Sequence, residues 1–171
     1  CALPIFNVAR SAPDGYTVFI TSNTTHASNQ SMLKRVPYDA IADFEPVTKL
    51  GTITLALVGH PSVLANNVQE LIAYAKANPG KLTWGSQGFG VAPHLLLELF
   101  KLEAGVDIVH VPYRGTAPML SAIVAGEIQM VADPMTTSLP HIQSGKLRPL
   151  AIAGNCRAVA DCGHTAGSAN R

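Results

Sequence analysis

The chain has 171 residues, of which 47% are hydrophobic and 13% charged, and its formal net charge at pH 7 is +1. This composition is typical of a globular protein, and the near-neutral charge argues against a nucleic-acid partner or a polybasic membrane patch. No apolar run approaches the roughly 20 residues that a membrane-spanning helix needs. The sequence as given also shows no signal-peptide pattern at its start.

The first third of the chain predicts two strands and one short helix. Pro13-Asp14-Gly15 is typical of a turn, and the β-branched and aromatic residues 16–21 that follow it predict a strand. A polar loop over 22–26 leads into a short helix around 29–34. Residues 45–58 alternate loosely and end in an apolar run, which predicts a long strand.

Beyond residue 66 the pattern becomes a regular alternation of helices and strands. Asn67 and Glu70 form a capping-box-like helix start. The helix that begins near Pro93 is apolar on most sides, so we expect it to be deeply buried. Strands alternating with helices at short spacing predict right-handed βαβ units and a parallel sheet. The expected helices begin at 68, near 93, at 116 and near 138, and the expected strands cover 82–85, 108–111, 128–132 and 147–153.

Small polar residues gather in three loops, each between a predicted strand and a predicted helix. These loops are Gly85–Gly90, Pro112–Thr116 and Asp133–Thr137. In an open parallel sheet the carboxyl ends of the strands face one crevice, so we expect the loops to converge there. The helices that start at this edge present free N–H groups and a positive dipole end. The sequence therefore predicts an anion-binding crevice without an obvious catalytic set.

Several motifs occur together in a characteristic order along residues 8–154. The ordered set resembles the Bug family, the extracytoplasmic solute-binding proteins of tripartite tricarboxylate transporters. The motifs are Ala12-Pro13-Asp14-Gly15-Tyr16-Thr17, Val36-Pro37-Tyr38-Asp39, Asp43-Phe44-Glu45-Pro46-Val47, Asn78-Pro79-Gly80-Lys81-Leu82, Pro93-His94-Leu95, His110-Val111-Pro112-Tyr113-Arg114-Gly115, Ala117-Pro118, Leu139-Pro140-His141-Ile142 and Gly145-Lys146-Leu147-Arg148.

The resemblance implies an α/β fold of the periplasmic-binding-protein (Venus flytrap) type, in which two βαβ lobes with parallel sheets close on a carboxylate. It implies a periplasmic location, membrane permease subunits as partners, and neither catalysis nor a cofactor. On this template residues 1–50 are part of a first lobe. Residues 51–154 are a second α/β lobe with crossover strands near 47–57 and 148–153. Residues 155–171 do not match the family, and we expect a disordered tail there and an incomplete first lobe.

The resemblance also assigns candidate ligand-binding residues. In the glycine-rich loop these are Ser86, Gln87, Gly88 and Gly90, and we expect Ser86 and the amides of Gly88 to Gly90 to form a cradle for a carboxylate. The alternative is a tight turn whose glycines serve geometry only. The polar loop after the first expected strand adds four further candidates, which are Ser22, Thr24, Thr25 and His26.

Each remaining candidate has a structural alternative. The hydroxyl cluster at 22–26 is equally typical of a helix N-cap. Arg114 is the one cation of the three crevice loops and could pair with a carboxylate, or it is a solvated loop arginine. Asp133 could orient a ligand or merely cap a helix. We expect four scattered histidines to serve packing, namely His60, His94, His110 and His141.

The alternative function is an α/β enzyme, either nucleotide-dependent or a hydrolase. Gly88-x-Gly90-x-x-Pro93 with Asp107 partly matches a dinucleotide fingerprint, but proline replaces the third glycine. Ser86 follows a strand as a nucleophile elbow would, yet Trp84 stands where that motif needs glycine. A metal is not expected, because no standard zinc spacing is present among Cys156, Cys162 and His164.

Overall fold

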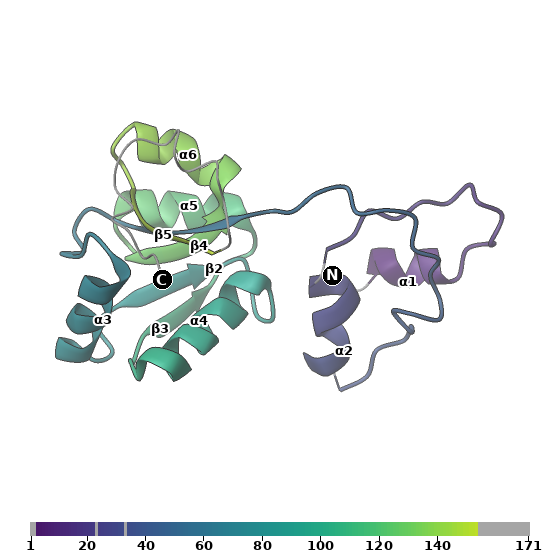
Figure 1. Cartoon of the computed structure of the whole chain (residues 1–171), viewed down its shortest axis with the longest axis horizontal. Helices are drawn as coiled ribbons and strands as arrows, with labels where there is room; N and C mark the ends of the chain where they lie inside the picture. The colour runs from purple at the N-terminus through teal and green to yellow at the C-terminus, as the bar shows by residue number, and fades with distance from the viewer. Residues whose placement is uncertain (1–2, 23, 33, 154–171) are drawn as a thin grey trace, which may run out of the picture. The chain divides into compact units, whose positions relative to one another are not determined.

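The computed structural model in Figure 1 describes residues 3–22, 24–32 and 34–153. The chain divides into two compact units, Cys1–Gly51 and Thr52–Arg171. The division falls one residue beyond the expected lobe boundary at 50. The tail expected over 155–171, with its two cysteines and His164, lies outside the described residues.

The first unit contains short helices and one small core. Its helical segments are α1 (Leu3–Ala9), the π-helical turn η1 (Thr24–Ser28) and α2 (Asn29–Met32). The helical region therefore begins about five residues before the expected start at 29. A small core joins the buried side chains of Ile5, Tyr38 and Ala40.

The strand expected over 16–21 is wrong. These residues adopt no strand, and the side chains of Tyr16, Val18 and Ile20 are 92%, 74% and 75% exposed. The β-branched and aromatic residues are present, but within the described part of this unit no second strand supplies the hydrogen bonds that a sheet requires.

The second unit is built on a five-stranded sheet with the strand order β3-β2-β4-β1-β5. Strand β2 pairs in parallel with β3 and with β4, as the alternation of elements predicts. The strand bounds are β1 (Leu55–Gly59), β2 (Thr83–Ser86), β3 (Val109–Pro112), β4 (Met130–Pro134) and β5 (Arg148–Ala153).

A wholly parallel sheet is nevertheless incorrect, because β1 runs antiparallel to both of its neighbours, β4 and β5. The sheet is mixed because no βαβ crossover joins β1 to a strand beside it. Its two neighbours, β4 and β5, are the last two strands of the unit in chain order. The long strand expected over 45–58 is also shorter than predicted. Only Leu55–Gly59 is strand, where neighbours exist on both sides.

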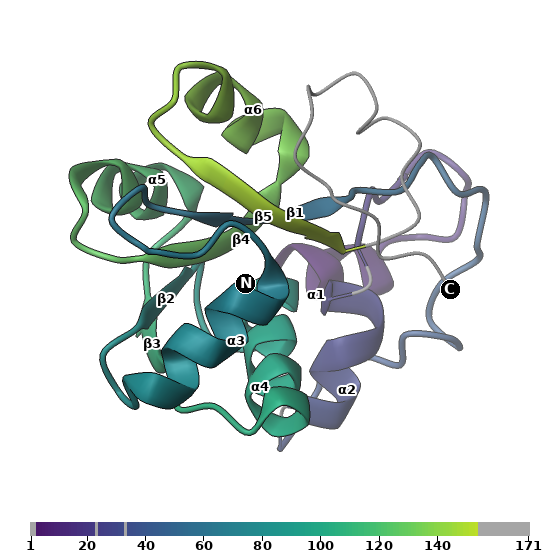
Figure 2. The same cartoon turned by 60° about the vertical axis from the view of Figure 1, so that its left-hand side comes forward.

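Two helices cover each face of this sheet (Figures 1 and 2). On one face α3 (Val68–Ala77) and α4 (Ala92–Ala104) pack on a core that includes Trp84 and Leu97. On the other face α5 (Thr116–Ala125) and α6 (Met135–Gln143) pack on a core that includes Met119 and Val131. The sequence signals for helix ends hold: the Asn67 side chain accepts the Glu70 N–H at 2.8 Å, and Gly105 ends α4 at φ 62°.

Two details of the helices differ from expectation. Helix α6 begins at Met135, three residues before the expected start. Helix α4 is not deeply buried, because only Pro93 and Leu97 lie fully in the core, while Leu99 and Leu102 are 55% and 79% exposed. No helix in the described ranges is long and apolar enough to cross a membrane.

Candidate ligand-binding crevice

The three polar loops do share one edge of the sheet. The parallel strands β2, β3 and β4 all end there, and each is followed by the start of a helix, α4, α5 or α6. Because β1 is antiparallel, its first residue, Leu55, is also at this edge, paired with Pro134 on one side and Ala153 on the other. The convergence predicted from the order of elements is therefore present within the second unit.

Ser86 is the buried anchor of the glycine-rich loop. Its hydroxyl donates to the Gly88 carbonyl at 2.7 Å and accepts the Gly88 N–H at 3.2 Å. The same oxygen lies 2.7 Å from Nε2 of His110, on the neighbouring strand β3. A serine has one proton to give, so if Ser86 donates to the Gly88 carbonyl then Nε2 of His110 donates to Ser86, and if Ser86 donates to His110 then that nitrogen accepts.

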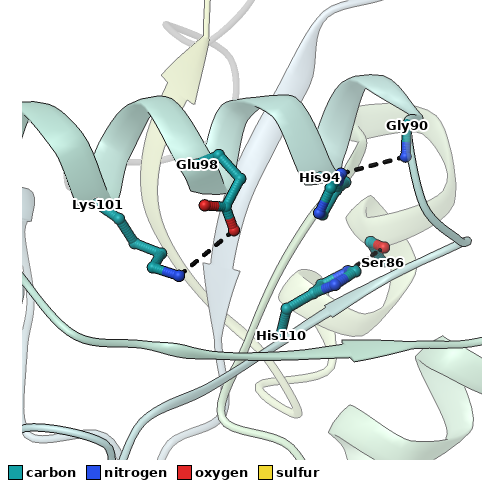
Figure 3. Close-up of polar contacts among 6 residues, drawn as sticks. All are labelled: Ser86, Gly90, His94, Glu98, Lys101 and His110. Carbon is teal, nitrogen blue, oxygen red and sulfur yellow. Dashed lines mark hydrogen bonds and ion pairs between the residues drawn. The ribbon is translucent and has the colours of Figure 1, made fainter. Parts of the chain in front are cut away.

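A second histidine closes the other end of the loop. Nδ1 of His94, in the first turn of α4, accepts the Gly90 N–H at 3.1 Å, which requires that nitrogen to be unprotonated (Figure 3). The two imidazole rings lie 4.3 Å apart. Phe89 presents its ring edge-on to both of them, at 5.6 and 5.2 Å, and is itself 74% exposed.

The expectation that His94 and His110 only fill space is therefore incomplete. Each makes a specific bond to the loop that the sequence marks as a ligand candidate. One available signal was the position of His94 in the first turn of the helix that follows the glycines. His110 gave no such signal, because its contact with Ser86 depends on the register of two strands.

Two of the expected cradle amides are already engaged. The N–H groups of Gly88 and Gly90 bond inside the loop, to Ser86 and to His94. At the start of α4 the N–H groups of Val91 and Ala92 have no partner among the described residues. The open donors of this crevice therefore lie one to two residues further along the chain than the glycines.

Asp133 is fully buried, and both of its carboxylate oxygens accept hydrogen bonds from other side chains. Gln87 Nε2 donates to its Oδ1 at 3.1 Å, while the hydroxyls of Thr137 and Ser138 both donate to its Oδ2, the latter at 3.0 Å. Burial raises the pKa of Asp133, and the three hydrogen bonds oppose that rise. This carboxylate ties the glycine-rich loop to α6, so neither it nor the donated Gln87 proton is free for a ligand.

Arg114 and the first-unit candidates differ in what they offer. Arg114 is exposed in the loop between β3 and α5, and its guanidinium makes no bond within the described residues. In the first unit, Ser22 is exposed, and its carbonyl accepts the N–H of His26 at 3.1 Å. The ring of His26 lies edge-on to Phe44 at 5.0 Å, and Thr24 is half-buried in η1. The side chain of Thr25 lies outside the described residues.

The geometry does not favour the enzyme alternatives. Asp107 precedes β3 and lies against Gly80, at the edge opposite the crevice, so it cannot serve the dinucleotide role. Ser86 and His110 form a serine–histidine pair, but the serine is 0% exposed, its hydroxyl oxygen also lies 2.7 Å from the Gly88 carbonyl, and no described carboxylate bonds to His110. In the described residues no group of three or more His, Cys, Asp or Glu could hold a metal ion.

Comparison with known proteins gives consistent matches. The model of the tripartite tricarboxylate transporter family receptor matches residues 2–162. Protein BugT of Bordetella pertussis is 36% identical over 152 residues, which are 88% of this chain and 47% of BugT. Among solved structures, an R. palustris protein with adipate gives a TM-score of 0.81 at 35% identity, covering 88% of this chain and 50% of that one. MatC from Rhodopseudomonas palustris with bound malate gives 0.79 at 27% identity, with coverages of 94% and 55%. The chain spans about half the length of the curated relatives it matches.

Proposed function

Since this chain belongs to the tripartite tricarboxylate transporter receptor family, we propose that its crevice binds a small carboxylate in the periplasm and delivers it to the membrane permease subunits of such a transporter. The resemblance to Bug proteins and the periplasmic-binding-protein type of α/β fold are confirmed by the same matches. The matched family consists of receptors, which sets the enzyme alternative aside.

The observation that carries the carboxylate proposal is the pattern of open polar groups at the crevice edge. The amides of Val91 and Ala92 and the guanidinium of Arg114 are donors without a described partner, and the nearby acid, Asp133, is buried and saturated. Unpaired amides at a helix start together with an exposed cation favour an anion. The adipate and malate in the two structural relatives are both dicarboxylates.

Arg114 provides the sharpest test. In the protein that carries this chain, titration calorimetry should show binding of adipate or malate and no binding of a nucleotide. Arg114→Gln should weaken the binding about 10- to 100-fold, because a charge-assisted hydrogen bond contributes about 1.5–3 kcal/mol. The matched control is Arg148→Gln. Arg148 is paired with Gly59 at the opposite edge of the sheet, where it bonds to Asn66 at 3.1 Å.

Two results would contradict the proposal. Binding of a nucleotide in preference to every carboxylate would overturn the ligand class. Equal loss of affinity in the Arg114→Gln and Arg148→Gln variants would place the effect in general electrostatics rather than in the crevice.

A further inference from the structure

We propose that His94 and His110 are positioning residues that hold the Ser86–Gly90 loop in its binding shape. The inference rests on the proposed function, since the shape in question leaves the amides of Val91 and Ala92 open to a carboxylate. Neither histidine needs to touch the ligand. Each acts through a loop atom, Gly90 N–H in one case and Ser86 Oγ in the other.

The loop needs such anchors because its own conformation is unusual. Gly88 and Gly90 have φ of 140° and 77°, and a glycine-containing loop is intrinsically the most flexible kind. The two imidazoles fix it at its first and last residues, and Gln87 fixes it between them through Asp133. One histidine comes from β3 and the other from α4, so the loop is tied to the two elements that flank the crevice (Figure 3).

The two rings differ in what a proton would do to their bonds. His94 must keep Nδ1 unprotonated to accept the Gly90 N–H, and a proton there would place two donors face to face. Burial lowers the pKa of His110, and the neighbouring His94 lowers it further. The other charged groups of α4 that act on His110 are Glu98, which raises its pKa, and Lys101, which lowers it. These two form an ion pair of 3.4 Å. From the strand side, His110 faces the neutral Ser86, and from the loop it faces the ring of Phe89.

The contact of His110 does not depend on a neutral ring. Nε2 of His110 can donate to Ser86 Oγ from the neutral ring or from an imidazolium, because the added proton enters at Nδ1. Only the bond from the Gly90 N–H to His94 requires an unprotonated nitrogen.

Isosteric substitutions can distinguish the effect of the hydrogen-bonding ring nitrogens from the effect of the volume of the rings. His94→Asn retains an acceptor near the position of Nδ1, whereas His94→Leu removes it. His110→Gln retains a donor near the position of Nε2, whereas His110→Leu removes it. The matched control is His60→Leu: His60 Nδ1 accepts the Ser62 N–H at 3.2 Å, the same kind of bond, and His60 follows β1 at the opposite edge of the sheet.

Two readouts decide the proposal in the protein that carries this chain. Adipate calorimetry at pH 7 should show about a tenfold loss for the two crevice leucine variants, recovery to within about threefold for His94→Asn and His110→Gln, and no change for His60→Leu. NMR exchange of the Gly90 amide proton needs no ligand, and it should be slow in the parent and in His94→Asn but fast in His94→Leu.

Calorimetry and amide exchange together distinguish a failure of this inference from a failure of the proposed function. If the Gly90 amide exchanges equally in the parent and in His94→Leu, the positioning role is overturned whatever the ligand. If that amide behaves as expected while neither adipate nor malate binds the parent, the positioning of the loop stands and the carboxylate proposal fails.

Discussion

Two stretches of this chain are both predicted to be strands, but only one of them forms a strand in the structure. Residues 16–20 are all β-branched or aromatic, yet they form no strand and expose Tyr16, Val18 and Ile20. Residues 55–59 have weaker alternation, yet they form β1, paired on both sides and buried from Ala56 to Gly59. Strand propensity thus leads to a strand only where neighbouring strands pair with the segment and a core buries it.

The difference extends to the cores beneath the two stretches. In the first unit the described core joins three buried side chains with a few half-buried aromatics. In the second unit, separate cores lie on the two faces of the sheet and bury β1 and β4 along nearly their whole length. Stability should accordingly be concentrated in the second unit, and three measurements test this contrast.

The largest difference is expected in amide hydrogen exchange. Residues 56–58 should open only with the whole second unit, with a free energy of about 5 kcal/mol or more, whereas residues 16–20 should exchange with almost no protection. Comparable protection in the two stretches would mean that residues 16–20 find a strand partner in solution. The two units would then not differ in strand pairing as the structure shows.

A matched pair of substitutions should give the next largest effect. Val58 is fully buried in β1 and Val18 is 74% exposed. Val58→Ala should lower the free energy of unfolding by about 2 kcal/mol through lost burial and a residual cavity, whereas Val18→Ala should change it by less than about 0.5 kcal/mol. Urea unfolding followed by the fluorescence of Trp84, the single tryptophan, measures the first effect, and circular dichroism covers both. Equal effects of the two substitutions would contradict the contrast in burial.

The smallest expected effect is that the contributions of Asp133 and Asp39 to the free energy of unfolding change with pH in opposite directions. In the second unit, burial raises the pKa of Asp133 above the usual value of about 4, so its contribution to stability is present at low pH and is lost as the pH rises through the folded value. In the first unit, the backbone N–H groups of Ala42 and Ile41 lower the pKa of Asp39, so its contribution is present at neutral pH and is lost as the pH falls.

Replacing each aspartate by asparagine should remove the corresponding slope. NMR signals from each unit, followed in urea between pH 3 and 7, would report the two slopes separately. Glu70 of the second unit also has a lowered pKa, so the Asp133 contribution is the difference between the parent and Asp133→Asn. If the parent gains stability relative to this variant as the pH rises, the Asp133 hydrogen bonds outweigh its burial.

Local signals predicted much of the second unit. The Asn67 cap, the glycine stop at Gly105 and the helix periodicity located α3 and α4 to within a few residues, because caps and turns depend on neighbours in the sequence. The direction of β1 was not predictable in this way, because side-chain alternation is the same for parallel and antiparallel neighbours.

The site shows the same division. Order along the chain predicted which loops converge, since parallel strands end at one edge. The engagement of the Gly88 and Gly90 amides was not predictable, because it depends on where His94 and Ser86 point. The role of His110 depends in turn on the register between β2 and β3, which composition and periodicity do not encode.

The antiparallel direction of β1 has a consequence for how the second unit can be handled. Leu55, where the sheet begins along the chain, is directly paired with Ala153, where it ends. Paired residues of adjacent antiparallel strands lie about 5 Å apart, so the two ends of the sheet meet. Domains whose ends meet tolerate circular permutation and insertion into a loop of another protein. Residues 55–153 therefore form a cassette that could be grafted through one short linker on each side, with the crevice loops beside the junction.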